Sequence, residues 1–161
     1  MNVPTLDLSK FIIGNDQERK VFSDDLGQSF NQTGFAIIKN HDLRKKITDE
    51  LYKVIKAFFD LEDEKKIKYY FPDLYGQRGY VVKGQEHAKG SKKGDLKEFF
   101  HIGNPSIYNP KNIWPHEIES FNEIGSEVFI TLENIGLTLL RAISMYLNLD
   151  INYFEDKVKG G

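Results

Sequence analysis

The sequence contains no cysteine among its 161 residues. This absence excludes disulfide bonds, thiolate nucleophiles and the zinc or iron–sulfur sites that depend on cysteine ligands. Because disulfides are rare in reducing compartments, the absence also fits a cytoplasmic protein, which is the location we expect.

Excess charge and long apolar runs are also missing. The formal net charge is -2, which provides no overall attraction to nucleic acid or to anionic membranes. No uninterrupted apolar run approaches the roughly 20 residues of a membrane-spanning helix, and Pro4, Asp7 and Lys10 interrupt the N-terminus in a way that a signal peptide does not tolerate. With 40% hydrophobic and 29% charged residues, the chain is expected to form a soluble globular domain that binds neither membranes nor nucleic acid.

Hydrophobic periodicity predicts alternating strands and helices in the first 66 residues. Residues 3–8 and 35–39 are predicted strands. A helical stripe lies between a predicted N-cap, at Asn15 or Asp16, and a predicted stop at Thr33-Gly34. A second stripe from residue 43 to residue 59 predicts a strong helix, and residues 61–66 predict a short one, with acidic residues first and basic residues last.

The second half of the chain has fewer regular elements. Residues 71–94 are predicted to form loops with a short strand at 79–82, and residues 95–102 a further strand. A long helical pattern runs from residue 115 to residue 143, although Gly125 and Gly136 disfavour one unbroken helix. A last short helix is predicted from residue 149. The order is mixed α and β, with too few strands for a complete sheet.

The four histidines are the candidate metal ligands: His41, His87, His101 and His116. A histidine-based site needs at least two converging ligands, usually with a carboxylate. No His-x-Asp, His-x-Glu or His-x-x-x-His spacing occurs. We therefore expect no complete metal site in this chain.

The segment TGFAIIKNHDL, residues 33–43, places His41 beside Asp42 after a predicted strand. The pair could belong to an acid/base site. Asn40 or Asp42 could instead cap the helix expected near Leu43 by accepting hydrogen bonds from its first N–H groups. The joint between strand and helix is the favoured interpretation.

Two loop segments could bind ligands. The glycine-rich residues 84–94 lack the GxxxxGK[ST] pattern, and the basic cluster Lys89, Lys92 and Lys93 lacks interleaved aromatic residues, so a solvated loop is favoured over phosphate or nucleic-acid binding. Arg78, Gly79 and Tyr80 could present a guanidinium fork to a carboxylate. An ordinary surface arginine beside a turn glycine is the alternative.

Five segments in order carry a resemblance: VPTLDLS, GFAIIKNHDL, FFDLEDEKKIKYY, RGYVV and DLKEFFHIG. Together they resemble the N-terminal region of the isopenicillin N synthase-like family of non-haem Fe(II), 2-oxoglutarate-dependent oxygenases. The segment YLNLDINYFEDKV is similar to the helix that precedes the family's catalytic core, so the resemblance covers residues 3–158. Asp42 departs from the family's usual glycine after Asn-His.

The resemblance implies an α+β fold, namely the helical and short-strand N-terminal region of a double-stranded β-helix (jelly-roll) oxygenase with most of the jelly-roll core missing. Residues 1–105 would form this region, and residues 106–161 the loop and long helix that lead to the core. The family's iron ligands, a His-x-Asp pair and a distant histidine, and the arginine that binds 2-oxoglutarate belong to the jelly-roll. The resemblance therefore implies no catalytic residue and no metal ligand in this chain.

The resemblance also assigns roles to particular residues. Arg78 and Tyr80 lie where the family's loop can face substrate, so a substrate-binding role becomes as plausible as the surface alternative. Structural roles are implied for the remaining motif residues, which are Asn40, His41, Asp95, Lys97 and Glu98.

We therefore expect the N-terminal part of an Fe(II)/2-oxoglutarate-dependent oxidoreductase that acts on a small molecule, as a truncated chain or the product of a broken or split gene. Such a chain would not be catalytic alone, and its exposed apolar faces would favour homodimers or aggregation. The alternative is a free-standing, non-catalytic module that pairs with another chain.

Overall fold

The computed structural model describes residues 2–85, 94–106 and 110–158. The chain divides into two compact units, one of residues 1–44 and 131–161 and one of residues 45–130. Helix α5 (Phe121–Tyr146) contributes its first part to the second unit and the rest to the first. The expected boundary at residue 105 falls inside the second unit. The two units are defined by packing, and the first of them combines two separate stretches of the chain.

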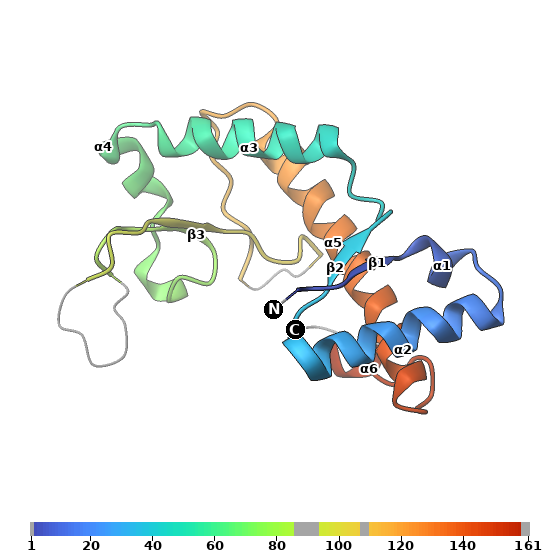
Figure 1. Ribbon diagram of the computed structural model, residues 1–161. Coiled ribbons are helices and arrows are strands. Elements are labelled where there is room, and N and C mark those ends of the chain that lie inside the picture. Colours follow the sequence, from blue (N-terminus) through green and yellow to red (C-terminus); the bar gives the residue numbers. More distant parts are fainter. Residues whose placement is uncertain (1, 86–93, 107–109, 159–161) are drawn as a thin grey trace. The chain divides into compact units, whose positions relative to one another are not determined.

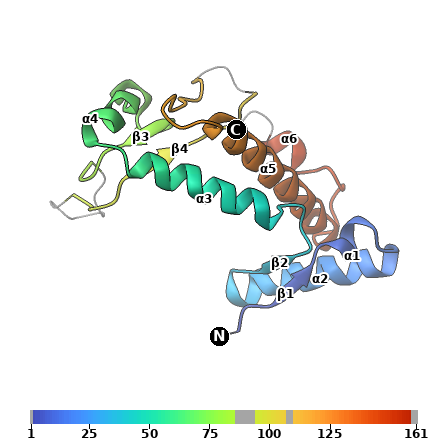
Figure 2. The same ribbon diagram turned by 90° about the horizontal axis from the view of Figure 1, so that it is seen from above.

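The first unit is built around two short parallel strands, β1 (Thr5–Asp7) and β2 (Ile37–Lys39), which lie side by side in Figures 1 and 2. Parallel strands need a long crossover, and here it contains α1 (Ser9–Ile12) and α2 (Asp16–Thr33). The core of this unit forms where α1 and α2 meet the last part of α5. Its buried residues are Leu6, Leu8, Phe11, Phe22, Leu26 and Ala142.

Both ends of α2 follow the sequence prediction. The side chain of Asn15 accepts a hydrogen bond from the backbone N–H of Glu18, and the Glu18 carboxylate accepts one from the N–H of Asn15, which forms a capping box. At the other end Gly34 takes the left-handed conformation with φ of 77°, which a glycine adopts at little cost. The structure confirms the predicted start and stop, with Asn15 rather than Asp16 as the N-cap and Gly34 as the residue after the last turn.

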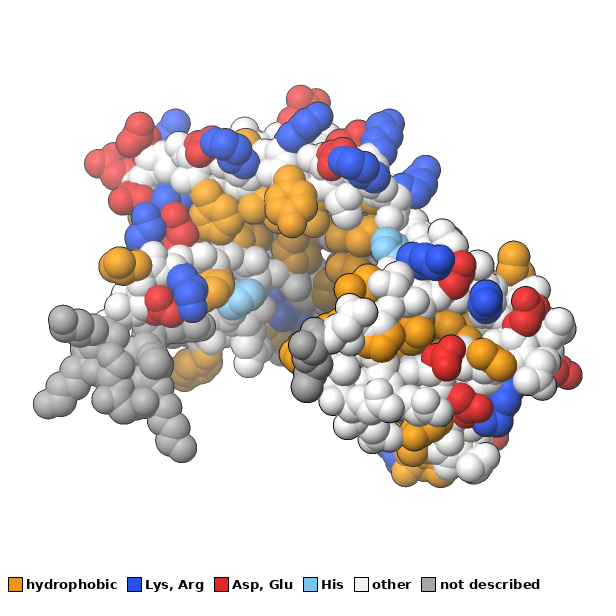
Figure 3. Space-filling model, viewed as in Figure 1, with side chains coloured by type: hydrophobic (Ala, Val, Ile, Leu, Met, Phe, Trp, Pro, Cys, Tyr) orange, Lys and Arg blue, Asp and Glu red, His pale blue; other side chains and the backbone are white. Residues whose placement is uncertain are grey.

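The second unit places α3 (Lys45–Phe59) beside a small antiparallel sheet. The elements after α3 are α4 (Asp63–Lys66), two 3-10 turns at Ile67–Tyr69 and Pro72–Leu74, β3 (Gly79–Val81) and β4 (Phe99–His101). Phe58 is fully buried, and its ring contacts the rings of Tyr80 and Phe100 at centroid distances of 5.7 Å and 4.7 Å. The outer face of α3 carries alternating charges (Figure 3), including the Lys45–Asp49 ion pair.

Several predicted boundaries need correction. Helix α3 begins at Lys45, so neither Asn40 nor Asp42 stands directly before its first turn. Asn40 instead has a φ of 54°, and its side-chain amide donates to Oδ2 of Asp7 at 2.8 Å. Strand β4 covers only 99–101 of the predicted 95–102, because its partner β3 offers three residues for pairing.

Helix α5 continues through both of its glycines. A Cβ on Gly125 would lie 2.9 Å from Ile102 and 3.2 Å from Trp114, so the missing side chain allows close packing. Gly136 has nothing within 4 Å of its Cβ position. The last helix, α6 (Glu155–Val158), begins later than the predicted residue 149, after a series of turns.

Length and composition alone would allow α5, with 26 residues, to cross a membrane. It contains residues of both signs, such as Glu123 and Arg141, so the sequence has no uninterrupted apolar run there. The core helix of a soluble protein meets the same two criteria, and the absence of membrane binding remains a prediction.

Candidate functional site

A buried lysine, Lys66, lies at the end of α4 and is only 3% exposed. Its ammonium nitrogen lies 2.9 Å from Oε2 of Glu98 and 3.0 Å from Oδ1 of Asp63. It also lies 5.7 Å from the ring centroid of Tyr80, within the range of a cation–π contact. A charge buried this far is stable only with such partners, so Lys66 fixes α4 against the sheet.

Glu98, directly before β4, is the centre of the polar network. Its Oε2 accepts a hydrogen bond from the Tyr80 hydroxyl at 2.6 Å in addition to the contact with Lys66, and Lys83 lies 3.4 Å from Oε1. The register brings these groups together, because Tyr80 pairs with Phe100 and Glu98 lies two residues before it. We call Lys66, Tyr80 and Glu98 the buried triad.

The protonation states of the buried triad follow from its geometry. Burial would raise the pKa of Glu98, but the hydrogen bonds from Tyr80 and Lys66 outweigh it and hold the pKa below its usual value. Burial lowers the pKa of Lys66, yet its contacts with Glu98 and Asp63 give a net increase. Burial, together with the neighbouring Glu98 carboxylate, raises the pKa of Tyr80 to about 12. At neutral pH the triad is an ammonium, a neutral phenol and a carboxylate, which suits positioning rather than proton transfer.

A cavity of about 400 Å³ lies beside the buried triad. Its lining residues are Asp63, Glu64, Ile67, Tyr80, Val82 and Lys83. The wall is therefore an apolar strip with charged groups of both signs at its edge, and the Tyr80 ring is held in this wall by its bond to Glu98.

Arg78 is not one of the described residues that line this cavity. It precedes Gly79, whose φ of 77° breaks the regular alternation of the strand, and its guanidinium packs against the backbone of Gly103. Nη1 donates to the Gln77 carbonyl at 2.7 Å, while Nε is buried without a hydrogen-bond partner. The side chain of Asn112 holds the Gly103 backbone at both its N–H and C=O. The structure thus separates Arg78 from the cavity that Tyr80 lines.

The other motif residues lie outside the cavity. Asp95 pairs with Lys97 at 2.8 Å, and the hydrogen bond from Lys97 lowers the pKa of Asp95. In the first unit, hydrogen bonds from Ser9 and Asn40 to Asp7 lower the pKa of the Asp7 carboxyl. Nδ1 of His41 is buried and has no hydrogen-bond partner among the described residues.

The sequence analysis placed Lys66 and Asp63 in a short helix at residues 61–66 and gave neither residue a role in a site. The available signal was the position of Lys66 three residues before the buried Tyr69, which puts both on one side of a helical turn.

Tyr69 is the centre of a second cluster of polar contacts. Its hydroxyl donates to the Glu117 carboxylate, accepts from the backbone N–H of His116 at 3.2 Å, and lies 3.1 Å from the His116 Nδ1 atom.

Iron would need a set of converging imidazole and carboxylate groups. Within residues 2–85, 94–106 and 110–158, no group of three or more His, Cys, Asp and Glu side chains is arranged to hold a metal ion. These residues therefore do not fit an iron centre. The basic cluster at residues 89–93 and His87 lie outside the described part of the chain.

Comparison with known proteins identifies the family to which the chain is similar. Residues 3–117 match the sequence model described as non-haem dioxygenase in morphine synthesis, N-terminal. The chain is 30% identical over 159 residues to a leucoanthocyanidin dioxygenase of Malus domestica, covering 98% of this chain and 44% of the relative. It is 29% identical over 171 residues to a 2-oxoglutarate-dependent dioxygenase of Aspergillus rugulosus, with 96% and 52% covered.

Solved structures agree with the sequence comparison. A putative 2OG-Fe(II) oxygenase family protein from Caulobacter crescentus superposes with a TM-score of 0.80 at 33% identity, covering 95% of this chain and 51% of that one. A full-length protein of Neurospora crassa, solved in complex with alpha-KG, gives a TM-score of 0.84 at 26% identity, with 95% and 49% covered. The chain spans about half the length of the relatives it matches. It belongs to the non-haem dioxygenase family, of which it forms an N-terminal part.

Proposed function

We propose that this chain is the N-terminal part of an Fe(II)- and 2-oxoglutarate-dependent oxidoreductase that acts on a small-molecule substrate. The observation that carries the proposal is the family match over residues 3–117, supported by relatives named as 2-oxoglutarate-dependent dioxygenases. Iron and 2-oxoglutarate would supply the oxidising chemistry, and residues of a jelly-roll that is not in this chain would hold them. The chain alone would not be catalytic.

The contribution of the chain itself would be structural support and part of a substrate-facing wall. The buried triad holds β3, β4 and α4 together, and the bond from Tyr80 to Glu98 orients the Tyr80 ring. Among the described residues the Arg78 guanidinium makes one hydrogen bond, from Nη1 to the Gln77 carbonyl, and the remaining N–H groups of its terminal nitrogens could donate to an acidic group. Arg78 and Tyr80 would therefore contact substrate from two places rather than one.

Turnover of 2-oxoglutarate to succinate tests the proposal. The coding sequence is read beyond Gly161, and the longer product and the 161-residue chain are each supplied with Fe(II), 2-oxoglutarate and oxygen. We expect a downstream His-x-Asp segment with a later histidine, succinate from the longer product, and none from the chain alone. A native protein with the 18.6 kDa mass of this chain and no succinate formation would contradict the proposal.

The alternative function is a non-catalytic module that pairs with another chain. Large apolar side chains on the first unit favour it, because Phe35 is 69% exposed and Ile37, on strand β2, is 52% exposed. Recovery of the native 161-residue chain in a stable complex with a second polypeptide would support this alternative.

A further inference from the structure

A second cavity lies in the first unit, where α1 and α2 face the last part of α5. Its volume is about 410 Å³, which is within the usual range for small-molecule sites. The lining residues are Phe11, Ile12, Arg19, Thr138, Arg141, Met145 and Ile151. Most of this wall is apolar, and two guanidinium groups provide its charge.

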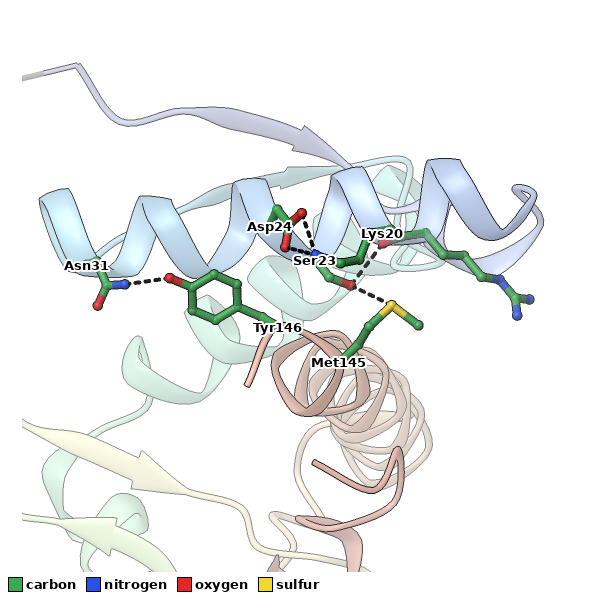
Figure 4. A network of polar contacts seen from close by, with 7 residues as sticks. Lys20, Ser23, Asp24, Asn31, Met145 and Tyr146 are labelled. Atoms are coloured by element: carbon green, nitrogen blue, oxygen red, sulfur yellow. Dashed lines mark hydrogen bonds and ion pairs between the residues drawn. The ribbon is translucent and has the colours of Figure 1, made fainter. Parts of the chain in front are cut away.

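Arg19 is the less satisfied of the two arginines. Its Nη2 donates to the Ile12 carbonyl at 3.3 Å, whereas Nε is buried without a hydrogen-bond partner. No carboxylate pairs with Arg19 in the part of the chain that the structure describes. Its neighbour Lys20, by contrast, is paired with Asp24 one turn along α2 (Figure 4). A guanidinium has five N–H donors, and Nη2 has the one acceptor found among the described residues, so the half-buried Arg19 side chain that lines the cavity keeps N–H groups for an incoming anion.

Arg141 is already neutralised from one side. Its Nε and Nη2 both approach the single oxygen Oε1 of Glu155, at 2.6 Å and 2.5 Å. The charged groups at the cavity are thus Arg19, Arg141 and Glu155, with a net charge of about +1 at neutral pH. One negative charge on a ligand would balance them.

The apolar wall is fixed by contacts between α2 and α5. The Ser23 hydroxyl donates to the Arg19 carbonyl at 2.9 Å and its oxygen lies 3.4 Å from the Met145 sulfur, while the Asn31 amide donates to the Tyr146 hydroxyl at 2.8 Å (Figure 4). The ring of Tyr146 packs directly on Gly27, where a Cβ would overlap it. These contacts hold Met145 in the wall of the cavity before any ligand binds.

We propose that this cavity binds a small carboxylate with an apolar body, with the carboxylate at Arg19 and the body against Phe11, Met145 and Ile151. The guanidinium fork matches the geometry of a carboxylate. The apolar wall selects a ligand with hydrocarbon or aromatic surface over a fully hydrated anion. The proposal does not depend on the oxidoreductase function.

Methyl NMR of the whole chain tests the proposal, with 4-phenylbutyrate as the probe. The sequence contains two methionines, Met1 and Met145, so ¹³C-methyl labelling of methionine gives at most two signals, and the variant Met145→Leu identifies the one in the cavity. We expect 4-phenylbutyrate, titrated to about 10 mM, to shift the Met145 signal in a saturable manner. The neutral amide 4-phenylbutyramide and inorganic phosphate should produce much smaller shifts.

Variants at neighbouring positions locate the carboxylate. Arg19→Gln should weaken binding of 4-phenylbutyrate by about tenfold or more. Arg19→Lys keeps the charge but loses the fork, so it should weaken binding by less. Lys20→Gln is the matched control, because it removes a cation from the adjacent exposed residue and should leave binding unchanged. Circular dichroism checks that each variant is folded. If Arg19→Gln does not fold, the binding of 4-phenylbutyrate by Arg19→Lys is compared with that of Lys20→Gln instead.

Four results would overturn the proposal. These are no saturable shift at Met145, an equal shift with the amide, an equal shift with phosphate, and equal weakening by the Arg19 and Lys20 variants. The absence of a shift would exclude a binding site. An equal shift with the amide would exclude recognition of the negative charge, and an equal shift with phosphate would exclude recognition of the ligand's apolar body. Equal weakening by the two sets of variants would exclude Arg19 as the residue that binds the carboxylate.

Discussion

The ammonium nitrogen of Lys66 lies 2.9 Å from Oε2 of Glu98, although 32 residues separate the two along the chain. Lys66 ends α4, and Glu98 stands directly before β4. Since each charge is poorly hydrated in this position, the pair is stable only while both members are present. The contact therefore links a helix to a strand that share no local sequence signal.

Replacing Glu98 should destabilise the second unit. The variant Glu98→Gln leaves the ammonium of Lys66 buried with only the exposed Asp63 as an anionic partner. Breaking a buried ion pair from one side costs about 3 kcal/mol in the free energy of unfolding. Urea unfolding, monitored by circular dichroism, measures this loss.

The matched control for that measurement is Glu119→Gln, because Glu119 is exposed. It should change the free energy of unfolding by less than about 0.5 kcal/mol. Equal unfolding midpoints for the two variants would show that Lys66 and Glu98 are not coupled as the structure indicates.

Local signals explain which parts of the fold could be predicted from the sequence. The capping box of Asn15 and the left-handed Gly34 are encoded within a few residues, and the structure confirms both ends of α2. The extent of β4 depends on its pairing with β3, and the course of α5 through Gly125 depends on the approach of Trp114. Neither of these tertiary contacts can be inferred from the hydrophobic periodicity of the segments concerned.

The candidate site was harder to predict for the same reason. A lysine is seldom buried, so Lys66 in a charged segment suggests a solvated helix end. Its burial depends on Tyr80 and Glu98, which become its neighbours only when the sheet forms. The sequence drew attention to Tyr80 and Glu98 through family motifs, and the roles assigned to them remain predictions.

Alkaline pH should weaken the fold through two buried tyrosines. Burial raises the pKa of both Tyr69 and Tyr80 to about 12, with Glu117 and Glu98 as the hydrogen-bonded carboxylates. The folded state keeps protons that the unfolded state, with a tyrosine pKa near 10.0, gives up. This contribution to stability is complete below pH 10 and is lost as the pH rises from 10 to about 12.

Ultraviolet titration of tyrosinate measures the effect. Tyr80→Phe should remove about half of the ionisation phase near pH 12, because two groups contribute to it. Tyr52→Phe, at a site that is 75% exposed, controls for the loss of one chromophore. If the late phase is unchanged in Tyr80→Phe, the hydroxyl of Tyr80 is not held by Glu98 in solution.

Exposed apolar side chains should cause the 161-residue chain to associate. Phe35, Tyr52 and Leu96 are 69%, 75% and 87% exposed, and orange hydrophobic groups reach the surface at several places in Figure 3. Size-exclusion chromatography with light scattering should show dimers or larger species. A single monomeric peak with cooperative unfolding would contradict this expectation.

Two glycines with the same backbone conformation should respond differently to alanine. Gly79 and Gly84 have φ angles of 77° and 81°, so alanine at either position incurs the left-handed cost of about 1 kcal/mol. A Cβ on Gly79 would also lie 2.5 Å from the carbonyl oxygen of Tyr69, whereas a Cβ on Gly84 would have no atom within 4 Å. Because backbone cannot move aside cheaply, Gly79→Ala should reduce the free energy of unfolding by about 3 kcal/mol or more, and Gly84→Ala by about 1 kcal/mol. Urea unfolding of the two variants in parallel measures the difference, and equal costs would mean that β3 does not approach Tyr69 as closely as the structure shows.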